Sequence, residues 1–304
     1  HFYAGDLDMA KKLIDKGFYL SFGGVVTFKK ADRLKIIENI PIDRVLLETD
    51  CPYVTPSPYR GKRNEPAYIK YVAEKIAEHL KISINDLARI TNKNANQLFG
   101  FEKKNYYQNI VYRYKNAVYI NLTNRCTNDC IFCIRNISEN VGDADSLWLD
   151  HEPTVNEVMK ELYDVFEKEP DIEEVVFCGY GEPMIRVDAI KRISQKIKEK
   201  WDNKHIRINT NGLGNIYHGK NILSDLDKVI DSVSISLNAE NPVVYQKVSQ
   251  AVFGEDSYNE ILKFIEFAKK HIKNVQLSVV EINEIDIKKC REVAEKFKLE
   301  LKIR

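Results

Sequence analysis

Three cysteines within eight residues are the part of this sequence best suited to chemistry. They lie in the run Cys126-Thr-Asn-Asp-Cys130-Ile-Phe-Cys133, directly after an alternating, β-branched stretch at residues 117–123. The alternation predicts a strand, and a strand that leads into so tight a loop can direct three sulfurs to one point. Three converging thiolates can hold an iron–sulfur cubane or, with a fourth ligand, a zinc ion.

The other interpretations of these thiols are weaker. A zinc site needs a fourth ligand, and the closest downstream is His151, eighteen residues beyond Cys133. A disulfide would leave one thiol over, and Cys-x-x-Cys pairs that close are usually redox-catalytic. The spacing therefore favours an iron–sulfur cluster, with zinc second. The remaining cysteines, at positions 51, 178 and 290, are scattered, so we expect a single cluster and a reducing cytoplasm rather than a disulfide scaffold.

Unusual residues also follow three of the later predicted strands. They form the runs Gly179-Tyr-Gly181-Glu182-Pro183, Asn209-Thr-Asn211-Gly212 and Ser234-Ile-Ser236-Leu-Asn238. Glycine lets a ligand approach the backbone, and a carboxylate can hold an ammonium group. Each run alone is typical of an ordinary turn. In parallel α/β folds, however, strand ends share one edge of the sheet, so these residues are expected beside the cysteines.

The elements that would position these groups alternate between strand and helix. We expect strands at 109–114, 117–123, 174–178, 206–209, 233–237, 275–280 and 299–303, and helices at 154–166, 187–201, 222–228, 258–271 and 287–297. This order predicts an open, partial (β/α)6 barrel, although periodicity alone does not separate it from a nucleotide-binding open sheet. The loop at 134–153 is either a lid or binding loop, or a mobile insertion.

The first hundred residues form a separate α/β segment. Helices are expected at 9–16, at 31–39, after Pro66 and after Ser83, with strands at 18–22 and 44–48. The polar run after Phe101 marks a boundary, giving domains at 1–104 and 105–304. His1 and Asp50 lie at or beside strand ends, where barrel enzymes keep their ligands, but each alone is more typical of a surface or capping group.

Composition excludes some classes of protein. The 304 residues are 44% apolar and 30% charged, which is ordinary for a globular protein with room for two domains. The net charge of +1 and the absence of a strongly basic half argue against a large nucleic acid, although nucleotides stay open as partners. No apolar run approaches the ~18 residues of a membrane span, and no secretory signal is visible, so we expect a cytoplasmic protein with no membrane partner.

Four stretches of residues 1–100 resemble, in order, the last third of the TatD family of metal-dependent hydrolases. They are His1-Phe-Tyr-Ala-Gly5, residues 17–24, Leu47-Glu-Thr-Asp-Cys-Pro-Tyr53 and residues 60–66. The resemblance implies a (β/α)8 barrel that binds divalent metals, with His1 and Asp50 matching two ligands. The segment that would supply the paired histidines, the glutamate and another histidine is absent here. We therefore expect a truncated barrel piece that is hydrolytically inactive as it stands.

Residues 117–304 resemble the radical S-adenosylmethionine superfamily. The resemblance rests on the three cysteines together with the Gly-x-Gly-Glu-Pro and Thr-Asn-Gly runs at successive strand ends. It implies an enzyme in which Cys126, Cys130 and Cys133 bind three irons of a [4Fe–4S] cluster. S-adenosylmethionine chelates the fourth iron and is cleaved reductively to a 5′-deoxyadenosyl radical. The resemblance also implies a small electron donor, such as flavodoxin or ferredoxin.

The cofactor contacts follow from the same resemblance by position. Phe132 would lie against the adenine, Gly181 and Glu182 would contact the methionyl ammonium, and the carboxylate or ribose would contact Asn209, Ser236 and Asn238. The fusion as a whole resembles the TatD-associated radical protein family. Two rival functions stay open: a TatD-type nuclease or esterase in a longer parent protein, and a non-catalytic metal-binding module. The substrate is not indicated.

Overall fold

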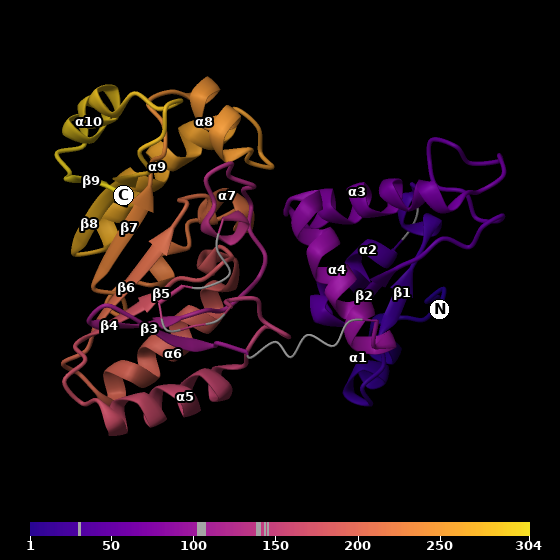
Figure 1. The fold of residues 1–304 in the computed structure, drawn as a ribbon, viewed down its shortest axis with the longest axis horizontal. Helices are drawn as coiled ribbons and strands as arrows, with labels where there is room; N and C mark the ends of the chain where they lie inside the picture. The colour runs from indigo at the N-terminus through magenta and orange to yellow at the C-terminus, as the bar shows by residue number, and fades with distance from the viewer. Residues whose placement is uncertain (30–31, 102–107, 138–140, 143, 145) are drawn as a thin grey trace. The chain divides into compact units, whose positions relative to one another are not determined.

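The structure is a computed structural model that describes residues 1–29, 32–101, 108–137, 141–142, 144 and 146–304. The chain divides into two compact units, residues 1–105 and 106–304 (Figure 1). The domain boundary predicted at 104/105 lies outside the described residues. In the described part of the chain, no helix is both long and apolar enough to cross a membrane.

The first unit is built around two short parallel strands. β1 (Leu20–Phe22) pairs with β2 (Val45–Leu47). Its helices are α1 (Leu7–Asp15), α2 (Arg33–Glu38), α3 (Ile69–Leu80) and α4 (Ile84–Phe99). The first strand begins two residues later than predicted because Phe18 is 55% exposed and stands outside the pairing. Two strands do not make a closed barrel, which agrees with the expected barrel piece.

Helix ends in this unit follow local chemistry. The Ser83 hydroxyl accepts the backbone N–H of Asp86 at 3.0 Å, so it caps α4 as predicted. The buried side chain of Asn94 on α4 donates to the carbonyls of Ile42 (2.9 Å) and Val45 (2.7 Å). These two bonds hold α4 beside β2, and they satisfy polar groups that burial would otherwise leave without partners.

The second unit contains a seven-stranded sheet whose strands follow chain order (Figure 1). They are β3 (Val111–Tyr114), β4 (Ala117–Ile120), β5 (Glu174–Phe177), β6 (His205–Thr210), β7 (Ser232–Ser236), β8 (Asn274–Val279) and β9 (Leu301–Ile303). β3 and β4 form an antiparallel hairpin across Lys115 and Asn116, and the other pairings are parallel. The sheet ends at β3 and β9 without closing, which confirms an open, partial barrel of six parallel strands.

The helices of this unit are α5 (Val155–Lys168), α6 (Val187–Lys200), α7 (Gly214–His218), α8 (Pro242–Ser249), α9 (Asp256–His271) and α10 (Ile287–Lys296). The helix predicted over 222–228 is wrong: only a 3-10 turn forms, at Leu223–Asp225. Lys228 has a φ of 65°, which ends any right-handed helix there. α7 and α8 were not predicted, although Asn241 and Pro242 supply a cap and a first helical residue for α8.

The two faces of the sheet differ sharply in chemistry. Alternate residues of β4 to β8, including Val118, Phe177, Ile208 and Ile235, belong to one large apolar core shared with the helices. Because successive side chains of a strand point to opposite faces, the intervening polar residues lie on the other face. They include Tyr119, Glu174, Arg207, Asn209, three serines of β7, Gln276 and Ser278. The inner face of the partial barrel is therefore polar.

Candidate functional site

The cysteine loop leaves the end of β4 and is held by the end of α8. The backbone N–H of Ile131 donates to the carbonyl of Val248 at 2.9 Å, and that of Asp129 donates to Ser249 at 3.1 Å. Deeper in the loop, the side-chain N–H of Asn128 donates to the buried hydroxyl of Tyr245 at 2.8 Å. These bonds fix the loop to the helical layer, so its thiols have a defined position at the strand-end rim.

The three thiols of the loop are partly exposed and form no disulfide. The Cys126 sulfur accepts the backbone N–H of Asn128 at 3.4 Å and the side-chain N–H of Asn211 at 3.9 Å. Burial, with a smaller contribution from the nearby Cys133 thiol, raises the pKa of the Cys130 thiol to about 12. Thiolates bind metal, so a positively charged metal centre would be needed to deprotonate Cys130 at neutral pH.

The donor set fits a cluster better than a single ion. In the described ranges no three side chains of His, Cys, Asp or Glu are grouped to hold a metal ion, so the three sulfurs of this loop do not meet at one point as the sequence predicted. His151, the nearest fourth ligand for zinc, instead contacts Glu157 at 2.9 Å at the start of α5. A cubane binds each thiolate through a different iron, so its ligands need not meet at one point. Three reduced thiols on one loop therefore suit an iron–sulfur cluster.

The glycine-rich turn after β5 packs directly against the cysteine loop. A Cβ atom on Gly181 would lie 2.3 Å from the carbonyl oxygen of Thr123 and 2.5 Å from that of Arg125, so only glycine fits. The next backbone N–H, of Glu182, donates to the same Arg125 carbonyl at 2.8 Å. The predicted neighbourhood of the cysteines and Gly181-Glu182 is thus present in the fold.

The Glu182 carboxylate is buried and connects two strand ends. It accepts the Thr210 hydroxyl (2.7 Å) and the backbone N–H groups of Asn211 (2.7 Å) and Met184 (3.0 Å). Burial nevertheless raises the pKa of the Glu182 carboxyl to about 7. A cation bound beside this carboxylate would favour its charged form and so lower the pKa of Glu182. A carboxylate that receives an ammonium group should respond in this way.

Asn211 is a site residue that the sequence did not single out. Its side-chain N–H contacts Cys126, as above, and donates to the Thr127 hydroxyl at 2.8 Å, while its backbone N–H donates to Glu182. It therefore joins the cysteine loop to the turn after β6. The Thr-Asn-Gly run includes Asn211, but the family resemblance indicates Asn209 for the cofactor contact.

The other predicted contacts lie on neighbouring strands. Asn209 accepts the Arg207 guanidinium at 2.9 Å, and Ser236 ends β7 on the inner face of the sheet. Asn238 is buried with a φ of 53°, a left-handed conformation that Asn tolerates better than most residues. Phe132 packs partly buried against the apolar core. These positions share the rim region by strand order, and their roles stay predictions.

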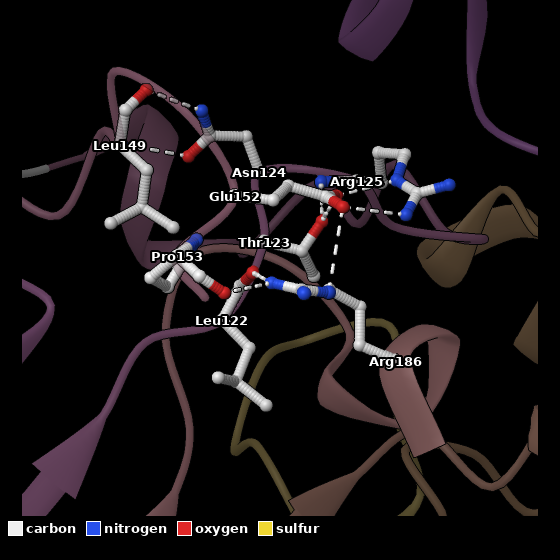
Figure 2. Close-up of polar contacts among 8 residues, drawn as sticks. All are labelled: Leu122, Thr123, Asn124, Arg125, Leu149, Glu152, Pro153 and Arg186. Atoms are coloured by element: carbon white, nitrogen blue, oxygen red, sulfur yellow. Dashed lines mark hydrogen bonds and ion pairs between the residues drawn. The ribbon is translucent and has the colours of Figure 1, made fainter. Parts of the chain in front are cut away.

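The loop between Cys133 and α5 is anchored where the structure describes its end (Figure 2). The Glu152 carboxylate accepts the Arg125 guanidinium at 2.7 and 2.9 Å, and Arg186 lies 3.5 Å away. Arg186 also donates to the carbonyl of Pro153 at 2.8 Å, and Asn124 pairs with Leu149. Residues 149–153 are therefore tied to the start of the cysteine loop, which contradicts a freely mobile insertion for this part.

A small polar cluster occupies the strand-end region of the first unit. The His1 imidazole lies 3.0 Å from the Asp50 carboxylate and 3.9 Å from Glu48, which also accepts the backbone N–H of Phe2 at 2.6 Å. The structure thus brings the two predicted residues together and adds Glu48, which sequence reasoning missed. Among the described residues, the side chains of His1, Glu48 and Asp50 are not grouped closely enough to hold a metal ion.

Comparisons with known proteins divide the chain in the same way. Residues 1–100 match the family described as TatD related DNase. "Uncharacterized metal-dependent hydrolase YabD" of Bacillus subtilis is 52% identical over 100 residues, covering 33% of this chain and 39% of that protein. "Uncharacterized metal-dependent hydrolase YcfH" of Escherichia coli K12 is 44% identical over 103 residues, covering 34% and 39%. The chain spans about two fifths of the length of these relatives.

Solved structures share these folds only distantly. The TatD homologue YJJV of Escherichia coli covers 34% of this chain and 40% of its own, with 24% identity and a TM-score of 0.32. A radical SAM methyltransferase from Sphaerobacter thermophilus covers 64% and 68%, with 12% identity and a TM-score of 0.37. Neither likeness is strong enough to support a function.

The larger match lies in the second unit, where residues 120–296 fit the family model of the radical SAM superfamily. That match spans the cysteine loop, the glycine-rich turn and the strand-end asparagines, and it covers more than half of the chain. With a TatD-type segment in front of it, this chain belongs to the radical SAM superfamily.

Proposed function

We propose that the second unit is a radical SAM enzyme with one [4Fe–4S] cluster on Cys126, Cys130 and Cys133. When bound, the cluster and S-adenosylmethionine supply reductive cleavage to a 5′-deoxyadenosyl radical, which abstracts hydrogen from a substrate. The observation that carries the proposal is the direct bonding of the cysteine loop to two other strand ends. Glu182 bonds to the backbone of Arg125, and Asn211 bonds to Thr127 and contacts Cys126.

The residues of the rim have distinct parts in this proposal. The carboxylate of Glu182 is buried and fixed by three donors, so it can receive an ammonium group without moving. Gly181 brings its backbone close to the cysteine loop, and Phe132 offers an aromatic surface to the adenine. Asn209, Ser236 and Asn238 provide polar groups for the carboxylate or ribose, and a small flavodoxin or ferredoxin would deliver the electron.

The test is anaerobic purification followed by iron analysis and measurement of 5′-deoxyadenosine. We expect about four irons per chain and release of 5′-deoxyadenosine that requires S-adenosylmethionine and a reductant. Cys130→Ala should abolish both. Cys51→Ala is the matched control, because this thiol is exposed in the first unit and outside the loop. Zinc in place of iron, or unchanged cleavage in Cys130→Ala, would contradict the assignment.

Hydrolytic chemistry in the first unit stays a separate prediction. His1, Glu48 and Asp50 are together, but their relatives are more than twice as long as the segment matched here. We propose that these residues form part of a divalent-metal site only in an intact TatD-type barrel, and that this chain alone is inactive as a nuclease or esterase. Metal-dependent hydrolysis by the chain as given would refute this.

A further inference from the structure

A cavity of about 750 Å³ lies on the polar inner face of the second unit. Its lining comes from both edges of the sheet and from strands between them, including Tyr119 of β4, Glu174 of β5, Arg207 of β6 and Lys302 of β9. Pockets for small molecules typically measure roughly 300–1,000 Å³. The cavity therefore has the size of a small-molecule site, and of the residues assigned to the cofactor only Asn209 lines it.

The charges around this cavity do not balance. Arg207 and Glu174 form a bidentate pair, at 2.8 and 3.1 Å, so their charges largely cancel. Lys302 and Arg304 also line the cavity, and neither has a carboxylate partner among the side chains that the structure describes. Arg304 instead donates to the Ser234 hydroxyl at 3.2 Å. Lys115, Lys302 and Arg304 thus line one open cavity with no paired carboxylate among the described side chains, and Lys115 lies over the ring of Tyr114.

The cavity also reaches the candidate cofactor rim. Cys178 and Asn209, which lie at the ends of β5 and β6, are part of its lining. The Arg207 guanidinium that pairs with Glu174 also donates to Asn209. A molecule that fills the cavity would therefore lie beside Asn209, which is assigned to the cofactor, and a substrate must lie close to the cofactor for hydrogen abstraction.

We infer that this cavity binds a small anionic substrate and that Lys302 and Arg304 hold its carboxylate or phosphate group. The Arg207–Glu174 pair forms a rigid wall that keeps Arg207 oriented, while the surrounding tyrosines supply apolar surface for the rest of the molecule. Ammonium and guanidinium groups are the side chains that bind such anions most strongly. The role of the anion as a substrate rests on the function proposed above, but the anion site itself does not.

The test uses Cys178, because this thiol lines the cavity and reports its occupancy. The full chain is treated with N-ethylmaleimide under anaerobic conditions, with cluster and S-adenosylmethionine bound, and alkylation of Cys178 is followed by mass spectrometry. Inorganic phosphate and succinate are the two anionic probes, and they distinguish a phosphate from a carboxylate ligand. Glycerol, and sodium chloride at equal ionic strength, are the controls for crowding and screening.

We expect at least one anion to slow alkylation in a saturable way, with no effect of either control. In Lys302→Gln/Arg304→Gln the half-protecting concentration should rise about tenfold or more. Arg291→Gln/Lys296→Gln removes the same charge from α10, outside the cavity, and should leave protection unchanged. The single variant Lys302→Gln changes an exposed side chain, so it gives the same comparison if the double variant fails to fold.

Absence of protection by both anions, or equal protection in the wild type and in Lys302→Gln, would overturn the inference. Repeating the measurement on the chain without cluster separates the two proposals. Protection by an anion, together with no cleavage of S-adenosylmethionine by the chain that carries its cluster, would keep the anion site and remove the proposed enzyme function. Cleavage without protection would keep the enzyme and remove the anion site.

Discussion

Replacing Glu152 by glutamine tests how the loop before α5 supports the site. The carboxylate receives the Arg125 guanidinium through two hydrogen bonds and is also close to Arg186 (Figure 2). The side chains of Arg125 and Glu152 are only 18% and 20% exposed. Removing one partner of a buried ion pair costs about 3–5 kcal/mol. Glutamine keeps one acceptor oxygen, so we expect Glu152→Gln to lower the free energy of unfolding by about 2–3 kcal/mol.

Tryptophan fluorescence during urea or thermal unfolding measures this loss in the second unit alone. The chain has two tryptophans, and both lie in that unit. For a unit of roughly 200 residues the expected loss corresponds to a fall in Tm of about 5–10 °C. Glu167→Gln is the matched control, because it removes the same charge from an exposed position on α5.

The pH dependence gives a second, independent check. Burial raises the pKa of the Glu152 carboxyl, but Arg125, Arg186 and Thr123 outweigh it, so its pKa in the folded chain is below the usual 4.5. A lowered pKa means that the stabilisation is complete above about pH 4.5 and is lost as the pH falls through the folded-state value. The difference between wild type and Glu152→Gln should therefore shrink in acid. A loss no larger than in Glu167→Gln, or one that is constant down to pH 3, would refute the reasoning.

Three further variants address other parts of the chain. Gly181→Ala places a Cβ against two carbonyl oxygens of the cysteine loop, so we expect about 2 kcal/mol or more of destabilisation in the fluorescence transition, and an unchanged midpoint would contradict the tight packing. Asn211→Ala removes an N–H donor to the Cys126 sulfur and should lower the reduction potential of the proposed cluster, measured by potentiometric titration after reconstitution. Ser83→Ala removes the cap of α4 and should lower the free energy of unfolding of the first unit by about 1 kcal/mol, measured by far-UV circular dichroism. The fluorescence transition, which reports the second unit, should not change.

Local patterns were sufficient to predict most elements of the second unit. The helix expected at 154–166 is α5, which begins at a capping box of Thr154 and Glu157, and the strands expected at 109–114 and 117–123 pair across Lys115 and Asn116. In each case the signal and the structure it predicts lie within a few residues. The 222–228 segment failed because its apolar residues are buried by tertiary contacts in a 3-10 turn, without the length that a helix needs.

Side-chain contacts between residues far apart in the chain could not be predicted from the sequence. Asn211 meets Thr127 across more than eighty residues, and Glu152 meets Arg125 across twenty-seven. Glu48 lies near His1 because the backbone N–H groups of Tyr3 and Glu48 both donate to carbonyls of β1. The residue types at these positions were ordinary ones for turns and loops, and no local spacing distinguishes a carboxylate that pairs within the fold from one that faces water.

Within single strands, the feature that says most about function is the alternation of polar and apolar residues. Parallel strands covered by helices on both faces usually read as continuous apolar runs. β7 instead reads Ser-Val-Ser-Ile-Ser, with Val233 and Ile235 in the helical core. On the opposite face, the Ser232 hydroxyl lies 2.8 Å from the His205 ring nitrogen, and the Ser234 hydroxyl accepts the Arg304 guanidinium at 3.2 Å. Burying a polar face costs stability unless its groups are hydrogen-bonded, so the alternation predicts a barrel interior built on polar contacts rather than on a second apolar layer.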